Sequence, residues 1–257
     1  MSHRLYGPKL GEESSSRQWL ILALSFVVAV WLWHSWLVFP IKLFVVLLHE
    51  LSHGLAALLV GGTIVSLEVD TRLGGSCLYL VPAGTLRRLL VTSAGYLGSM
   101  VGGGLLLWWT CRSRHPRVIT LVIGLLMAFP GLLFLKSGEW FGLLFVTGFG
   151  GGLLLAWRYL PEGFHGYLLK FLALTSCLYV IVDIKEDLID RTIAGSDADV
   201  IASLTGIPAV LVGLAWALIA LAVLGIVLRL CLKSRRWRGD IESATRPDRF
   251  QEISKNE

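Results

Sequence analysis

The sequence predicts an all-α polytopic membrane protein with six to seven transmembrane helices and one short β-hairpin after the second helix. Hydrophobic residues make up 55% of the 257 residues and charged residues only 16%, against about 25% in soluble domains. Apolar runs of about 20 residues, the length that spans a bilayer core about 30 Å thick, recur along the chain. This composition excludes a disordered chain, a water-soluble enzyme and a nucleic-acid-binding module.

Seven apolar runs are candidates for membrane-spanning helices. Five of them hold no Asp, Glu, Lys or Arg: residues 19–39, 89–110, 118–135, 140–157 and 206–228. The other two, residues 41–60 and 163–182, carry ionisable side chains. A charged group in lipid is costly and is rarely retained there without a role, so we look for function in these two runs.

The apolar runs predict a single transmembrane domain, residues 19–232, between a polar amino-terminal segment, residues 1–18, and a basic tail, residues 233–257. Lys and Arg mark cytoplasmic loops, so the tail and the loop that holds Arg112, Arg114 and Arg117 are expected on the cytoplasmic side of a plasma or inner membrane. Arg87 and Arg88 then fall on the opposite side, which leaves the number of spans at six or seven.

Residues 61–82, between the second and third runs, do not continue the apolar pattern. Polar and apolar residues alternate from Thr63 to Asp70, the pair Gly74-Gly75 follows, and residues 76–81 again favour a strand. Alternation on either side of a glycine pair predicts a short β-hairpin. An ordinary polar loop is the alternative.

The second run contains the pattern His49-Glu50-Leu51-Ser52-His53. Positions four apart lie on one face of a helix, so both imidazoles can bind one metal ion, while Glu50, turned by about 100°, can hold a water molecule beside it. Imidazole nitrogen suits Zn²⁺, and a site with three protein ligands leaves a fourth position for water whose pKa falls to about 7. The pattern therefore predicts one zinc ion per chain, with His49 and His53 as ligands and Glu50 as the catalytic base.

A third ligand must come from another helix, and the other ionisable run supplies candidates. It ends in Asp183, Asp187 and Asp190, which share one helical face. Asp183 follows twelve uncharged residues and is the deepest, so we predict that it is the third zinc ligand, with Asp187 as the alternative. Solvation of a helix end is the other interpretation of all three. Tyr179 and Ser176 share this face and could orient Asp183, steady an oxyanion, or only bond neighbouring helices.

The remaining polar residues have simpler explanations. His34 and His165 stand near span ends, His3 in the amino-terminal tail and His115 in an arginine-rich loop, so all four are expected at membrane interfaces. The sequence Ser196-Asp197-Ala198-Asp199, before the last run, is expected to cap a helix.

These motifs together resemble one known family. The sequence from His49 to Gly54 within a membrane helix, the glycine pair and strand-like stretch after it, and Ser93-Ala-Gly-Tyr-Leu-Gly98 in the next helix are similar to the site-2-protease family of intramembrane zinc metalloproteases, in particular its compact branch. The resemblance implies that the two motif histidines and an aspartate from a later helix bind zinc, that Glu50 is catalytic, and that substrates are single membrane helices. The family's usual third motif contains Asp followed by Gly, a dipeptide absent from this sequence.

The sequence thus predicts an intramembrane zinc metalloprotease that hydrolyses peptide bonds of membrane-embedded substrate helices, with a zinc-activated water and a glutamate general base. Its expected partners are single-span membrane proteins and the lipid bilayer, with no nucleic acid. A fourth protein ligand would instead make the protein non-proteolytic, with a structural or sensory zinc site. Turnover without any peptide substrate would indicate a zinc hydrolase of small amphiphiles.

Overall fold

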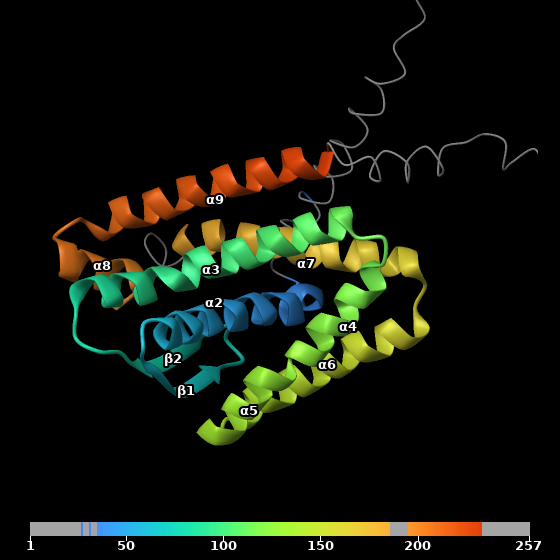
Figure 1. Ribbon diagram of the computed structural model, residues 1–257, viewed down its shortest axis with the longest axis horizontal. Coiled ribbons are helices and arrows are strands. Elements are labelled where there is room, and N and C mark those ends of the chain that lie inside the picture. The colour runs from blue at the N-terminus through green and yellow to red at the C-terminus, as the bar shows by residue number, and fades with distance from the viewer. Residues whose placement is uncertain (1–26, 28–30, 32–34, 186–194, 233–257) are drawn as a thin grey trace, which may run out of the picture.

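The computed structural model describes Val27, Trp31, residues 35–185 and residues 195–232. Within these residues the chain forms a bundle of helices with one two-stranded hairpin (Figure 1). The elements, in chain order, are η2 (Trp36–Val38), α2 (Phe39–Leu59), β1 (Thr63–Val69), β2 (Gly75–Leu80), α3 (Thr85–Arg112), α4 (Pro116–Leu126), α5 (Ala128–Ser137), α6 (Trp140–Tyr159), α7 (Glu162–Lys185), α8 (Asp197–Thr205) and α9 (Ala209–Leu232).

Six helical segments among the described residues are long and apolar enough to cross a membrane: Phe39–Leu59, Thr85–Arg112, Pro116–Ser137, Trp140–Tyr159, Glu162–Val182 and Ala209–Cys231. They correspond to the last six of the seven apolar runs, and they confirm the predicted polytopic all-α fold. Most of the first run, residues 19–39, lies outside the described residues, as do the segments 1–18 and 233–257.

One predicted span is divided. The run 118–135 forms two helices, α4 and α5, that meet at Met127. Pro130 explains the break, because it has no N–H to donate to the carbonyl group of Leu126 and its ring crowds that turn. The two helices still follow one another closely enough to form a single membrane crossing.

The predicted hairpin is confirmed. Strand β1 pairs antiparallel with β2, with a bulge between Ile64 and Ser66. The turn between the strands is held by the Asp70 carboxylate, which accepts hydrogen bonds from the backbone N–H groups of Arg72, at 2.7 Å, and Gly74, at 2.8 Å. Leu73, inside this turn, has a φ of 65°, a left-handed conformation that costs a leucine about 1–2 kcal/mol relative to glycine.

Helix α3 lies at the centre of the bundle, between α2 on one side and α9 on the other, with α7 behind it (Figure 1). Small residues bring α2 and α3 close together. A Cβ atom added to Gly98 would overlap the side chain of Ser52, and one added to Gly102 would lie 3.2 Å from the Cδ2 atom of Leu48. The Gly98-x-x-x-Gly102 pattern is therefore a helix-packing motif.

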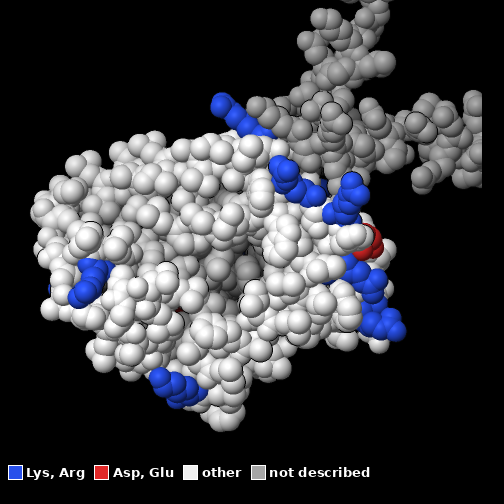
Figure 2. All heavy atoms as spheres, in the orientation of Figure 1, with Lys and Arg blue, Asp and Glu red and all other residues white. Residues whose placement is uncertain are grey.

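Basic side chains gather at one end of the bundle, drawn on the right in Figure 2. Arg117 joins the start of α4 to the end of α6, because its Nε donates to the carbonyl group of Trp157 at 2.6 Å. The last turns of α3 and α9 pack together at the same end, where Cys111 and Cys231 share one buried cluster. The α3–α4 loop and the end of α9 thus lie on one side, as the charge pattern predicts, and Arg87 and Arg88 lie at the opposite end of α3.

Candidate metal centre

Helix α2 brings the two motif histidines together near its middle. The Nε2 atoms of His49 and His53 lie 3.1 Å apart, as expected for residues one turn apart on one helical face. The Nδ1 atom of His53 lies 2.7 Å from the backbone carbonyl oxygen of Val91, which can only accept, so Nδ1 carries the proton. The Nε2 lone pair of His53 is therefore free to bind a metal ion, and α3 fixes the orientation of the ring.

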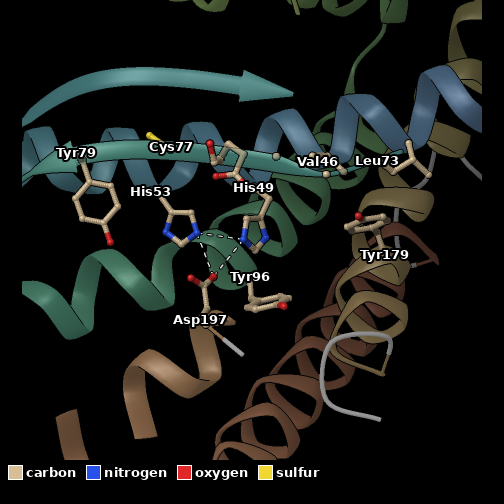
Figure 3. Close-up of a pocket in the computed structure, with 14 residues that line it drawn as sticks. Val46, His49, His53, Leu73, Cys77, Tyr79, Tyr96, Tyr179 and Asp197 are labelled. Carbon is tan, nitrogen blue, oxygen red and sulfur yellow. Dashed lines mark hydrogen bonds and ion pairs between the residues drawn. The ribbon is translucent and has the colours of Figure 1, made fainter. Parts of the chain in front are cut away.

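Asp197, at the first turn of α8, completes a group of three donors. Its Oδ2 atom lies 3.2 Å from the Nε2 atom of His49 and 3.1 Å from that of His53 (Figure 3). Donor atoms around a tetrahedral zinc ion lie about 3.3 Å apart, because bonds of about 2.0–2.1 Å diverge at the tetrahedral angle. Two imidazole nitrogens and one carboxylate oxygen at this spacing fit a zinc site.

The Asp197 carboxylate is ionised at neutral pH. Burial acts to raise its pKa, but the adjacent imidazole rings of His49 and His53 outweigh burial and lower the pKa to about 2. A metal ligand must be deprotonated, and this aspartate meets that condition without a metal ion.

Sequence reasoning missed Asp197 because helix capping was a sufficient explanation for its surroundings. The structure confirms the capping: Ser196 Oγ accepts from the Asp199 N–H, and the Asp199 carboxylate accepts from the N–H of Ser196. These two residues complete the capping box, which leaves the carboxylate of Asp197 without a role in the cap. That surplus acidic residue was the available signal.

The other predicted aspartates lie largely outside the described residues. Asp183 belongs to α7, but its side chain is not described, and Asp187 and Asp190 fall in residues 186–194. The prediction that Asp183 is the third ligand therefore stays a prediction. Of its two proposed helpers, Tyr179 lines the cavity beside the histidines, whereas the buried Ser176 donates to the carbonyl group of Leu172 within α7.

Glu50 faces the hairpin. The backbone N–H of Cys77 donates to its carboxylate, and a Cβ atom added to Gly75 would lie 2.8 Å from the Cγ atom of Glu50 and from Cγ1 of Val46. A residue without a side chain at position 75 thus lets β2 lie directly on α2. Burial raises the pKa of the Cys77 thiol to about 12, and the nearby charge of Glu50 acts in the same direction, so this cysteine is a neutral thiol.

A cavity of about 420 Å³ is lined by His49, Glu50, His53 and Asp197, among other residues. Its wall combines an apolar part at one end, formed by Val46, Leu73 and Tyr179, with a polar part along β2 at the other (Figure 3). The three donor side chains therefore face an open cavity and are not enclosed on all sides by protein.

Gly95 of α3 lies directly against the two imidazoles, and its replacement by alanine should remove the metal. An added Cβ atom would overlap the Nε2 atoms of both histidines, and it could be accommodated only if the rings or the helices moved apart. We expect Gly95→Ala to lose most of its zinc, as measured by metal analysis of the purified protein. Gly151→Ala on α6 is the matched control, because a Cβ atom there meets no described atom within 4 Å. Normal zinc in Gly95→Ala would contradict this prediction.

Comparison with known proteins agrees with this geometry. No curated protein and no solved structure matches the chain. The model of the Peptidase M50B-like family matches residues 21–227, a segment that contains His49, Glu50, His53 and Asp197. Together with the six apolar helices, the match indicates a multi-pass membrane protein of peptidase type. The chain belongs to the Peptidase M50B-like family, which confirms the resemblance to site-2 proteases.

Proposed function

We propose that this protein is an intramembrane zinc metalloprotease that cleaves peptide bonds of membrane-embedded substrate helices. One observation carries the proposal: two imidazole nitrogens and a carboxylate oxygen from distant parts of the chain converge within 4.8 Å of one another, next to a buried glutamate. His49, His53 and Asp197 are the proposed zinc ligands, and Glu50 is the proposed general base.

The zinc ligands and Glu50 have separate roles in the proposed hydrolysis. Zinc bound by three protein ligands would keep a fourth position for water and would lower the pKa of that water to about 7. Glu50, adjacent to His49 and buried against β2, takes a proton from water and delivers it to the departing amine nitrogen. The contact of His53 with the Val91 carbonyl group holds its ring in the ligand orientation throughout.

The hairpin supplies the proposed contact with substrate. The outer edge of β1 is already used, because the N–H of Leu67 donates to Ser137 Oγ at 3.1 Å and Lys136 Nζ donates to the carbonyl group of Ile64 at 3.2 Å. Strand β2 lines the cavity, with Gly75, Ser76, Cys77 and Tyr79 along it, and the N–H of Cys77 already donates to the Glu50 carboxylate. We infer that a segment of substrate, unwound from its helix, pairs with β2, since backbone groups in lipid must find hydrogen-bond partners.

Two other functions fit the site less well. A structural or sensory zinc site would have a fourth protein ligand, but among the side chains that the structure describes, to which Asp183 does not belong, the cluster has three members and opens on the cavity. A zinc hydrolase of small amphiphiles would not need the strand along the cavity wall. Single-span membrane proteins are therefore the proposed substrates, and the basic end of the bundle suggests a plasma or inner membrane.

Reconstitution tests the proposal. Purified protein with a measured zinc content would be incorporated into liposomes together with single-span membrane proteins, and cleavage would be followed by mass spectrometry of the fragments. We expect cleavage within the substrate's apolar segment, its loss when 1,10-phenanthroline removes the metal, and its return when zinc is restored. Zinc-loaded protein that cleaves lipid-like esters but no member of a substrate panel would favour the small-amphiphile hydrolase.

A further inference from the structure

Tyr79 lies beside the proposed metal centre but is neither a proposed zinc ligand nor the proposed general base. It belongs to β2, where it pairs with Ile64, and its side chain lines the cavity. Its ring is nearly parallel to that of His53, with an interplanar angle of 25° and ring centroids 6.3 Å apart. Figure 3 shows the ring on the side of His53 away from His49, with the hydroxyl group directed from the hairpin toward α3.

Helix α3 holds Tyr79 and His53 side by side. The carbonyl group of Val91 accepts from His53, and the hydroxyl group of the next residue, Thr92, is hydrogen-bonded to the Tyr79 phenol. Thr92 is 2% exposed, so this contact is sheltered from water. When Thr92 donates, the phenol oxygen is the acceptor, and the hydroxyl hydrogen of Tyr79 remains available to an acceptor in the cavity.

The phenol remains a hydrogen-bond donor at neutral pH. A tyrosine phenol loses its proton only in clearly alkaline solution, so the hydroxyl group carries its hydrogen under the conditions of the assay. A neutral hydroxyl group at the edge of the donor cluster is suited to stabilise negative charge that develops during a reaction.

We propose that the hydroxyl group of Tyr79 donates a hydrogen bond to the carbonyl oxygen of the scissile peptide bond, an inference that rests on the proposed function. As the oxygen of water bonds to the carbonyl carbon, the π electron pair of the C=O bond moves onto the carbonyl oxygen, which becomes negatively charged. The pair returns when the C–N bond breaks, and the amine departs with the proton that Glu50 carries. The hydrogen bond strengthens as the charge grows, so Tyr79 lowers the barrier more than it helps to bind substrate.

The other two tyrosines that line the cavity, Tyr96 and Tyr179, are not positioned to make this hydrogen bond. Tyr96 is 3% exposed and packs edge-on against His49, with ring centroids 4.7 Å apart, while its other side contacts Trp216. Its ring positions His49. Tyr179 lies at the opposite end of the cavity from Tyr79, next to the apolar side chains of Val46 and Leu73 (Figure 3).

Tyr79→Phe removes the hydroxyl group and keeps the ring against His53. In the reconstituted assay we expect kcat to fall by about 100-fold or more, with KM, zinc content and melting temperature close to those of the unchanged protein. Tyr167→Phe, the same change at a residue that is 74% exposed on α7, should leave all four quantities unchanged. A fall in zinc content that parallels the fall in kcat would show a structural role and would overturn the proposal.

Inhibitor binding tests the same hydrogen bond without turnover. A phosphinic peptide presents two oxygens on a tetrahedral phosphorus, one for the metal and one for a donor such as Tyr79, whereas a mercaptoacetyl peptide presents a single sulfur. We expect Tyr79→Phe to bind the phosphinic peptide at least 10-fold more weakly than the unchanged protein does. Its affinity for the mercaptoacetyl peptide should be unchanged. If the substitution changed the affinity of neither probe, the proposed role of Tyr79 would be overturned, while the proposed function would stand. If zinc-loaded unchanged protein bound neither probe and cleaved no peptide, the proposed function would fail, and this inference with it.

Discussion

Replacing Glu50 with glutamine should abolish peptide hydrolysis while the protein keeps its zinc. Glutamine retains the shape of the side chain that packs against Gly75, but it cannot take a proton from water. Because Glu50 is not among the three clustered donors, the metal should remain. We expect cleavage to fall by at least about 1,000-fold, a loss consistent with the 10²–10⁴-fold contribution of a general base.

Two measurements make this result specific. Zinc content and melting temperature of Glu50→Gln should match those of the unchanged protein, and Glu139→Gln, at the start of α6 and remote from the cavity, should cleave normally. Cleavage by Glu50→Gln at an undiminished rate would remove the glutamate from the mechanism and would leave the small-amphiphile and sensory functions as the ones to pursue.

Replacing Asp197 with asparagine should strip the site of zinc. The change removes the one negatively charged donor and leaves two neutral imidazoles, so we expect zinc affinity to fall by more than about 100-fold, beyond the 10–100-fold typical when a residue that only supports a ligand is lost. Competition with a fluorescent zinc chelator would measure the change. Asp199→Asn is the matched control, since it alters the same capping box without touching the histidines.

The same assay decides between Asp197 and the aspartates of the 183–190 segment. If the structure-based proposal is right, Asp183→Asn and Asp187→Asn keep their zinc. Zinc loss in Asp183→Asn, with normal zinc in Asp197→Asn, would return the third ligand to α7 as the sequence predicts. Loss in both variants would mean that both carboxylates contribute to metal binding.

The motif histidines were predictable because their geometry is local. His49 and His53 stand one helical turn apart, and the 3.6-residue period alone places their nitrogens within reach of one ion. The hairpin was predictable for the same reason, since the alternation from Thr63 and the glycine pair at 74 and 75 describe strand and turn within a few residues.

Asp197 was not predictable in this way. It lies 148 residues from His49 in sequence, and its position depends on the packing of α8 against α3 and α9. Periodicity within one helix carries no information about such a contact. The reasoning from depth in the membrane favoured a residue inside a long apolar helix, whereas the structure brings a carboxylate to the histidines from the first turn of a short helix.

The left-handed Leu73 makes the cavity easy to reshape in evolution. Glycine adopts this backbone conformation without strain, and asparagine does so more readily than leucine, so one codon change could relieve about 1–2 kcal/mol of strain while removing or shrinking the side chain that lines the cavity beside Val46. The loss of apolar packing around the half-buried Leu73 would cancel part of this gain in stability. Relatives that differ at this position can therefore diverge in the size of substrate residue they admit without losing the hairpin, whose turn is held by Asp70.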